Sequence, residues 1–497
     1  MEKKNIKDKI FVIVSLIAYI GITFVITMLH ENWRDEAQSF MIAKSLSFID
    51  IFKQLKYEGH PFVFYYVVRI FTLLGFGYRI VNIISWIVMC IVAYIILAKS
   101  PFSKLNKVLI LLTVPFIYQY VAFGRSYCLI ALFTILLAYL YNKKEKHPYI
   151  YACLIALLMN THIIMLGFCL MLVITFYIYE LILKRKELDK KQKRKYLISL
   201  GIILIAFILI VLQFCSTLSL NSYAKVDEQK LEISKIVKGC VNLVTYYYTY
   251  SLTNNEYAAI VMTILILSTI ICMLKYKTYK ETIILFGAIG YQMLFFVLLG
   301  QAKMYILMTF WILYVFYLWT VFNKQKDCAG DEKYKTVIAA LVSTTCLFSI
   351  LYGSFGMVYN DLRYEYSGAG SAAKYIEENI PSNSVFICVD DTLCGSIIPY
   401  LKDDYKFFSL ISNSYYKYVN WDENRNTGLE ITEYFDRIDK FIENNKQVEN
   451  IYIIFNIVPE SETYKYLMKK ELIRFEYMDI KSYSEYSENY YIYKIIK

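Results

Sequence analysis

The sequence has 497 residues, of which 58% are hydrophobic and 19% are charged, and its mean hydropathy is +0.42. This excess of apolar residues excludes an ordinary soluble domain and predicts a membrane protein. The formal net charge of +11 comes from lysines in short clusters between apolar runs, which indicates membrane orientation and argues against nucleic acid as a partner.

Apolar runs long enough to cross about 30 Å of hydrocarbon as a helix recur from residue 10 to residue 356. The first run, 10–29, is too long for a signal-peptide core and precedes no small-residue cleavage site, so we interpret it as a retained signal anchor. The runs predict a mainly α-helical, polytopic bundle of about eleven spans. These are 10–29, 80–98, 105–122, 124–141, 149–162, 163–183, 196–216, 257–274, 281–299, 303–322 and 336–356.

Lysine-rich clusters between the runs predict which loops face the cytoplasm. They all lie inside only if one of the two runs 61–76 and 80–98 does not cross the membrane. We interpret 61–76 as a helix on the outer surface, because it directly follows a polar loop and is separated from the next run by Gly75 to Arg79. The N-terminus is then cytoplasmic. The clusters are Lys3 to Lys9, Lys99 to Lys107, Lys143 to Lys146, Lys184 to Lys195, Lys275 to Lys280 and Lys324 to Lys335.

Beyond the last run, predicted helices and strands alternate, which is typical of a small α/β domain. We therefore predict a membrane domain of residues 1–366, with a first external loop at 30–79, and an extracytoplasmic α/β domain of residues 367–497. The second domain contains no Gly-rich phosphate loop and no nucleophile elbow. Its expected elements are a helix ending at Asn379, a strand at 384–389, a helix at 428–444, a strand at 450–456, a helix near 460–470, and strands near 472–478 and 490–496.

The acidic pair at 390–391 and the cysteines of the chain have structural interpretations. Asp390 and Asp391 follow a predicted strand, where ligands often bind in α/β sheets, but we interpret them as a solvated turn. Of the eleven cysteines in the chain, most lie in or beside apolar runs with no metal-binding spacing, so we expect buried thiols. Cys388 and Cys394 remain candidates for a disulfide.

Two adjacent carboxylates, Asp35 and Glu36, follow the first apolar run by only a few residues. A carboxylate beside low-dielectric surroundings is suited to act as a general base that deprotonates a hydroxyl. The structural alternative is that Asp35 caps a helix that rests on the membrane surface. Both residues are candidate catalytic residues.

A second polar segment, Glu58-Gly59-His60-Pro61, closes the same loop. Glu58 and His60 lie two positions apart in a segment that we expect to be extended, so they can reach one divalent metal, but two ligands do not define a metal site. Pro61 suits the first turn of the helix that follows. We expect no required cofactor and keep Glu58 and His60 as metal-ligand candidates.

Three cationic or imidazole side chains lie at predicted outer ends of spans. Arg125 lies in a short Gly124-Arg125-Ser126 turn, and its guanidinium can bind a phosphate with two hydrogen bonds. Lys303 departs from the inside bias of the other lysines, and His162 follows Asn160-Thr161. The alternatives are a snorkelling arginine and a hydrogen-bonded interfacial histidine. With His60, these are our candidates for binding a phosphate.

The motifs Asp35-Glu36-Ala37, Glu58-x-His60-Pro61 ahead of Tyr65-Tyr66, Arg125-Ser126-Tyr127 and Asn160-Thr161-His162 together resemble the GT-C superfamily of glycosyltransferases. The chain is most similar to the family that contains bacterial protein O-mannosyltransferases and lipid A aminoarabinose transferases. The resemblance extends over about residues 10–325. The chain departs from the family pattern in having Phe62 after Pro61 and no acidic residue shortly after Arg125.

This resemblance implies a donor and a set of roles. The expected activity is inverting transfer of a sugar from a polyprenyl-phosphate donor to a hydroxyl of a glycan, lipid or protein at the outer face of the cell membrane. Matching the motifs assigns the acceptor-side base to Asp35, with Glu36 beside it, and assigns Glu58 and His60 to the lipid phosphate or a metal. Arg125 corresponds to the family's arginine after the fourth run.

A protein of another class remains an alternative: a polytopic transporter or lipid flippase with an external accessory domain. Such proteins usually carry charges and broken helices near the membrane midplane, whereas the polar groups here collect at one face. A membrane assembly protein without catalytic activity is the third possibility. The sequence identifies neither a sugar nor an acceptor.

Overall fold

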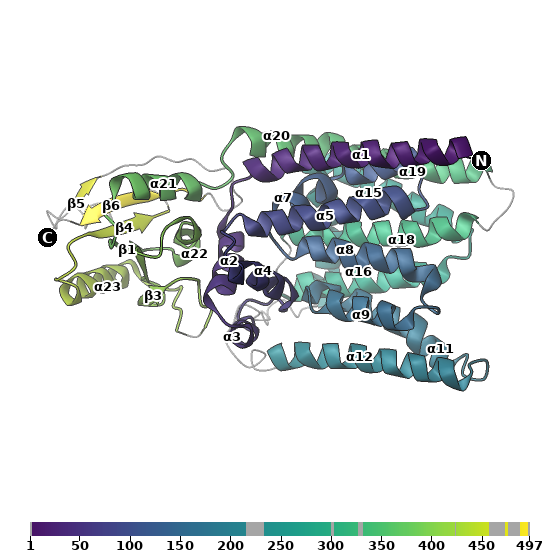
Figure 1. Ribbon diagram of the computed structural model, residues 1–497, viewed down its shortest axis with the longest axis horizontal. Coiled ribbons are helices and arrows are strands. Elements are labelled where there is room, and N and C mark those ends of the chain that lie inside the picture. The colour runs from purple at the N-terminus through teal and green to yellow at the C-terminus, as the bar shows by residue number, and fades with distance from the viewer. Residues whose placement is uncertain are drawn as a thin grey trace.

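The computed structural model describes residues 2–214, 233–299, 303–326, 332–422, 424–456, 473–475 and 488–495. Figure 1 shows an elongated molecule with a helix bundle at one end and a small sheet domain at the other. Three short helices lie between these two parts: α2 (Arg34–Ser45), α3 (Phe48–Gln54) and α4 (Val63–Leu73). The two carboxylates predicted to be catalytic belong to this middle layer.

Within the described residues, 8 helical segments are long and apolar enough to cross a membrane. They confirm the predicted polytopic α-helical bundle. The helices that supply them are α1 (Glu2–Leu29), α5 (Ile80–Lys99), α10 (Leu166–Leu172) with α11 (Tyr179–Ile182), α12 (Lys190–Phe214), α15 (Glu256–Leu274), α16 (Tyr279–Leu299), α17 (Met304–Leu307) with α18 (Thr309–Lys326), and α19 (Glu332–Ser349) with α20 (Phe355–Arg363).

The other three predicted spans are not straight full-length helices. The run 105–122 forms α6 (Lys104–Leu111) and a second helical segment, Pro115–Ala122, with a bend of 62° between them. Pro115 has no backbone N–H to donate to the preceding turn, which accounts for the break. The runs 124–141 and 149–162 form the shorter helices α8 (Tyr127–Leu140) and α9 (Pro148–Met159).

Helix α4, which corresponds to the run 61–76, has 11 residues. At about 1.5 Å per residue it spans roughly 16 Å, too short to cross the hydrocarbon core. It packs against α2 in the middle layer and leaves apolar side chains exposed near its C-terminal end, including Leu73, Leu74 and Phe76. This geometry agrees with the interpretation of 61–76 as a surface helix.

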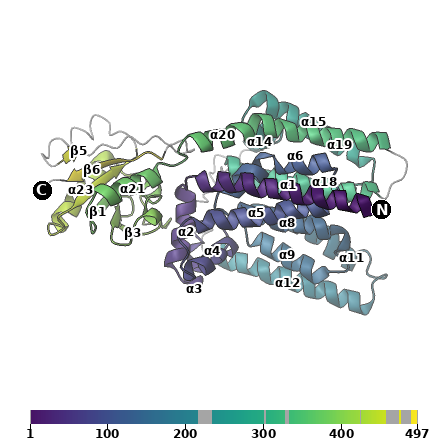
Figure 2. The ribbon, with the colours of Figure 1, turned by 45° about the horizontal axis from the view of Figure 1, so that its top comes forward.

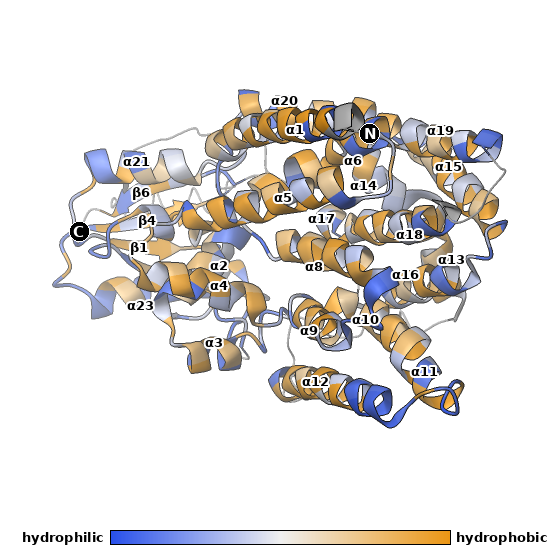
Figure 3. Cartoon of the chain, turned by 45° about the vertical axis from the view of Figure 1, so that its right-hand side comes forward, coloured by the Kyte–Doolittle hydropathy of each residue, from blue (hydrophilic) through white to orange (hydrophobic). Residues whose placement is uncertain are grey.

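The lysine clusters gather at the end of the bundle that is remote from the sheet domain. The N-terminus, the C-terminal end of α5 and the start of α12 all lie there (Figure 1). Figure 2 shows the same arrangement from another side, and Figure 3 shows hydrophilic residues at this end of α12. The bundle is therefore asymmetric: one end is basic, and the other carries the loop with Asp35 and Glu36.

The sheet domain is a mixed α/β unit whose 6 strands have the order β3-β2-β1-β4-β6-β5. The central strand β1 pairs in parallel with β2 and β4, and the other pairings are antiparallel. The strands are β1 (Val385–Cys388), β2 (Lys406–Ser409), β3 (Ser414–Tyr416), β4 (Ile451–Phe455), β5 (Ile473–Phe475) and β6 (Tyr491–Ile495), and the longer helices are α21 (Ala369–Asn379) and α23 (Ile431–Asn444). The sequence did not predict β2 and β3, and the helix expected near 460–470 lies outside the described residues.

The structure corrects the interpretation of Asp390-Asp391 as a solvated turn. Asp390 accepts hydrogen bonds from the start of α22 (Asp391–Cys394). Asp391 is buried and lies 2.6 Å from Nη2 of Arg425. The partner is 34 positions away, so no local pattern revealed it. Cys388 and Cys394 are both free buried thiols, so the candidate disulfide does not form.

Candidate active site

Helix α2 begins directly after the extended residue Trp33, and its first turn contains Asp35 and Glu36. The Glu36 carboxylate accepts a hydrogen bond from the Trp33 backbone N–H at 3.1 Å, which caps the helix. Acidic residues in the first turn also interact favourably with the helix dipole. The two neighbouring carboxylates have different surroundings: the Glu36 side chain is fully buried, whereas the Asp35 side chain is 21% exposed.

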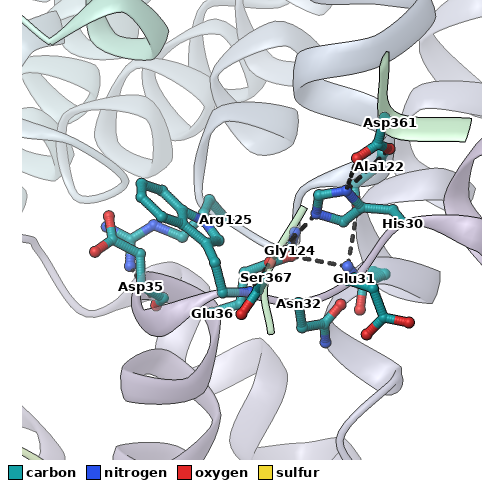
Figure 4. Close-up of polar contacts among 12 residues, drawn as sticks. His30, Glu31, Asn32, Asp35, Glu36, Ala122, Gly124, Arg125, Asp361 and Ser367 are labelled. Carbon is teal, nitrogen blue, oxygen red and sulfur yellow. Dashed lines mark hydrogen bonds and ion pairs between the residues drawn. The ribbon is translucent and has the colours of Figure 1, made fainter. Parts of the chain in front are cut away.

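Glu36 joins three separate parts of the membrane domain (Figure 4). Its Oε1 accepts hydrogen bonds from Nδ2 of Asn82 at 2.8 Å and from the backbone N–H of Gly124. Its Oε2 lies 3.5 Å from Nε2 of His30. Because both oxygens are already engaged by protein groups, Glu36 holds α2 in place against α5 and the turn before α8.

His30 lies between two carboxylates, a feature that the sequence analysis missed. Its Nδ1 is 3.1 Å from both carboxylate oxygens of Asp361 in α20, and its Nε2 faces Glu36. Burial alone lowers the pKa of His30, but the carboxylates of Asp361 and Glu36 overcome this and raise it to about 10. The sequence does place a histidine directly after the first span, which could have been noted. Its partner Asp361 is 331 positions away, so the sequence did not reveal the pair.

Asp35 and Arg125 meet at the end of the bundle that faces the sheet domain. Nη2 of Arg125 lies 3.6 Å from Oδ2 of Asp35, and the Tyr305 hydroxyl donates to the same oxygen at 3.5 Å. Nη1 of Arg125 donates to the backbone carbonyl of Asp35 and to Oγ of Ser39, both at 2.8 Å. The structure thus brings together two residues that the sequence analysis selected independently.

His60 and His162 extend this cluster. Nε2 of His60 is 3.1 Å from Nη2 of Arg125, and the rings of His60 and His162 lie 4.8 Å apart. Burial and then the charge of Arg125 lower the pKa of His60 to about 3, and burial is also the main cause that lowers the pKa of His162. Both imidazoles are therefore neutral near pH 7.

The contacts of the two imidazoles determine which nitrogen carries the proton. Nε2 of His60 faces an arginine N–H and acts as acceptor, so its proton is on Nδ1. Nδ1 of His162 accepts from the backbone N–H of Ile164 at 3.2 Å, so its proton is on Nε2. These two N–H groups and Nε–H of Arg125 are buried and make no hydrogen bond within the described residues. Three unused donors of this kind favour an anionic or oxygen-rich ligand.

Glu58 is held by Gln38, a residue of α2. Its Oε1 accepts from Nε2 of Gln38 at 2.7 Å, and the same amide pairs with the backbone of Val419 in the sheet domain. Burial raises the pKa of Glu58 to about 8. Glu58 and His60 are therefore both in use within the protein, through Gln38 and Arg125 respectively.

Lys303 precedes α17, the helix that contains Tyr305, and is half-buried. The neighbouring residues 300–302 lie outside the described part of the chain. Tyr305 brings this segment into contact with Asp35. The role of Lys303 in phosphate binding stays a prediction.

No group of three or more His, Cys, Asp or Glu side chains within the described residues is arranged to hold a metal ion. Glu58 and His60 thus have no third protein ligand there. Their assignment as metal ligands also stays a prediction.

The sheet domain contacts the first turn of α2 through Glu488. Its Oε1 accepts from the backbone N–H of Arg34 at 2.9 Å, and its Oε2 accepts from Oγ of Ser367. Burial raises the pKa of Glu488 to about 7. The turn that carries Asp35 is therefore held from the bundle by Glu36 and from the sheet domain by Glu488.

The fold and the cluster define a polytopic membrane protein with a carboxylate, a guanidinium and two imidazoles gathered at one end of its bundle. No family model and no curated protein sequence matches the chain. Among solved structures, it is similar to ArnT from Cupriavidus metallidurans, crystallised with undecaprenyl phosphate, with a TM-score of 0.55 and 11% identity over 97% of each chain. At this identity the likeness establishes the fold alone, and this ArnT-like polytopic fold is the one that the resemblance implied.

Proposed function

We propose that this protein is a membrane glycosyltransferase that takes a sugar from a polyprenyl-phosphate donor and transfers it to a hydroxyl acceptor. The observation that carries the proposal is the meeting of Asp35, Arg125 and His60 at the end of an ArnT-like bundle. That ArnT structure contains undecaprenyl phosphate, the lipid part of the donor class proposed here.

In the proposed reaction, an acceptor hydroxyl attacks the anomeric carbon from the side opposite the phosphate. The new carbon–oxygen bond forms as the bond to the phosphate oxygen breaks, and the hydroxyl proton passes to Asp35. Asp35 suits this role because its side chain is part-exposed and belongs to a fixed helical turn. The lipid phosphate leaves with its electron pair, and the anomeric configuration inverts.

The phosphate would lie against Arg125, His60 and His162, with Lys303 as a further cation. The support is the set of unused buried donors on the first three residues. Such prearranged donors stabilise charge that grows on a leaving group. In this proposal a divalent metal is not required, because Arg125 already supplies a fixed positive charge.

Glu36 has a different proposed role from its neighbour. Its two oxygens accept hydrogen bonds from Trp33, Asn82 and Gly124, which leaves it oriented away from an incoming acceptor. We assign to Glu36 the positioning of Asp35 and of the turn that contains Arg125. This replaces its interpretation as a second catalytic carboxylate.

The proposed orientation has the N-terminus in the cytoplasm and the sheet domain outside. The gathering of basic clusters at the remote end of the bundle supports this orientation. The site would then face the outer leaflet, where the sheet domain limits access of a glycan, lipid or protein acceptor.

The test is turnover of purified protein with undecaprenyl-phosphate sugars labelled in the sugar, supplied with a cell-envelope fraction as acceptor. We expect label to leave the lipid and undecaprenyl phosphate to accumulate. A flippase would instead move intact lipid-linked sugar between leaflets of a vesicle. Intact donor that changes leaflet, with no transfer across a panel of sugars, would overturn the proposal.

A further inference from the structure

His30 connects Glu36, one of the two carboxylates of the first loop, to a third carboxylate, Asp361. Asp361 in α20, His30 after α1 and Glu36 in α2 form a continuous contact, with distances of 3.1 Å and 3.5 Å. All three side chains are buried, and His30 and Glu36 are fully so. Figure 4 shows the His30 ring between the other two side chains.

The surroundings of His30 leave the two carboxylates as its main polar neighbours. The rings of Phe123 and Tyr366 lie 4.2 Å and 5.1 Å from its ring, so water is displaced from two sides. An uncompensated carboxylate in such surroundings is strongly destabilising. A charged His30 therefore balances the carboxylates of Glu36 and Asp361, which it contacts directly.

Glu36 connects His30 to Asp35 and Arg125, the two members of the proposed catalytic pair. It directly follows Asp35 in the helix, and it accepts the backbone N–H of Gly124, which directly precedes Arg125. A shift of the Glu36 carboxylate would therefore move the base and the guanidinium relative to each other. A displacement of about 1 Å can cost about 10²-fold in rate.

We propose that His30 is a positioning residue for sugar transfer: bridging Asp361 and Glu36, it sets the distance between Asp35 and Arg125. It touches neither donor nor acceptor. This inference rests on the proposed function, since its main readout is the transfer reaction. Through Asp361, His30 also contacts α20, the helix that leads into the sheet domain.

The experiment compares His30→Gln with the double variant His30→Gln, Glu36→Gln. Glutamine retains an N–H donor but carries no charge, so the single variant leaves both Glu36 and Asp361 uncompensated. We expect kcat to fall about 10- to 100-fold with little change in the donor KM. Removing the Glu36 charge should then restore at least a third of the lost activity on a logarithmic scale, because only Asp361 then remains without its cation.

The matched control is His147→Gln, an exposed histidine at the start of α9, which should retain wild-type kcat. Thermal midpoints in detergent identify variants that do not fold. If folded His30→Gln keeps wild-type kcat, or if the double variant is no better than the single one, the positioning role is wrong. If wild type transfers no sugar, the proposed function fails instead.

Asp361→Asn tests the second contact of His30. This variant should lower kcat less than His30→Gln does, because Glu36 keeps its cation.

Discussion

The guanidinium of Arg125 lies 3.6 Å from the carboxylate of Asp35, although the two residues are 90 positions apart. Asp35 belongs to the first turn of α2, and Arg125 belongs to the short turn before α8. The carboxylate of Glu36 joins the two turns by accepting the N–H of Gly124. This arrangement leads to separate expectations for the base Asp35, the cation Arg125, the turn at Gly124 and the buried carboxyl of Glu58.

Asp35→Asn should abolish most transfer while retaining donor binding. The amide has nearly the same shape but cannot accept the hydroxyl proton, and loss of a general base typically costs about 10²- to 10⁴-fold. Turnover of labelled donor measures the rate, and equilibrium binding of undecaprenyl phosphate measures binding. The exposed Asp403→Asn, which removes an ion pair with Lys44, is the matched control. Wild-type turnover in folded Asp35→Asn would exclude Asp35 as the base.

Arg125→Lys should weaken donor binding although it keeps the positive charge. Arginine donates here to a backbone carbonyl and to Ser39 and faces His60, a pattern that one ammonium group does not reproduce. Losing one or two charged hydrogen bonds of about 1.5–3 kcal/mol should raise the donor KM at least tenfold. Steady-state kinetics over donor concentration checks this. An unchanged KM would remove Arg125 from the phosphate site.

Gly124→Ala should disturb the turn that carries Arg125. A Cβ at this position would lie 2.4 Å from Cγ2 and 2.8 Å from the backbone carbon of Val81, closer than atoms can pack. We expect a destabilisation of about 1–3 kcal/mol and a lower transfer rate. Adding Val81→Ala to Gly124→Ala removes Cγ2 from this clash but leaves the Val81 Cβ 2.6 Å away, so it should restore only part of both losses.

The matched control for this substitution is Gly201→Ala in α12, where a Cβ meets nothing within 4 Å. Thermal midpoints and transfer rates are measured for wild type, Gly124→Ala, the combination of Gly124→Ala with Val81→Ala, and Gly201→Ala. If Gly124→Ala matches wild type in both, the close packing of α5 against this turn does not constrain the site.

Glu58 should make stability depend on pH. Burial, opposed by the hydrogen bond from Gln38, raises its pKa from 4.5 to about 8, so the folded protein binds a proton that the unfolded chain releases at lower pH. The stability from this group is full below pH 4.5 and is lost as pH rises through 8. Glu58→Gln, which is always neutral, should lose less thermal stability than wild type between pH 5 and about 8.5.

The control for the pH series is the exposed Glu443→Gln, which should follow wild type across the series. Thermal unfolding in detergent at several pH values gives the comparison. Parallel curves for wild type and Glu58→Gln would show that Glu58 does not retain its proton in the folded protein.

Cysteine labelling should determine the orientation of the bundle. Phe76 follows α4 and is half-exposed, so a cysteine there is accessible to a labelling reagent. In a cysteine-free background, an impermeant reagent applied to intact cells should label Phe76→Cys and should not label Glu145→Cys, at the remote end of the bundle. The reverse pattern would place the site on the cytoplasmic side.

Most of the architecture could be predicted because apolar length and lysine position are local properties. The run 10–29 became α1, and the strand expected at 384–389 became β1. The break before Pro115 was foreseeable from its missing N–H, but the size of the bend depends on packing. Strands β2 and β3 are short and contain few residues in a regular alternation, so the pairing of β2 with β1 and of β3 with β2 decided their structure.

The site was predictable only in part, for a related reason. Asp35, Arg125, His60 and His162 stood out because polar residues at membrane boundaries are costly and require an explanation. Their grouping is confirmed by contacts, whereas their chemical roles stay predictions. The partnerships of His30 with Asp361 and of Gln38 with Val419 join residues more than three hundred positions apart, and a single sequence contains no signal for such pairs.

Glu488 gives the site an order of assembly. The inner contacts of α2 are with His30, Asn82 and Gly124, which the ribosome has already made by the time α8 begins. The outer contact, on the N–H of Arg34, arrives only when the last described strand is synthesised. During most of its synthesis, the first turn of α2 therefore has its contacts with the bundle but lacks its contact with Glu488. The enzyme proposed here completes its own site as one of its last folding events.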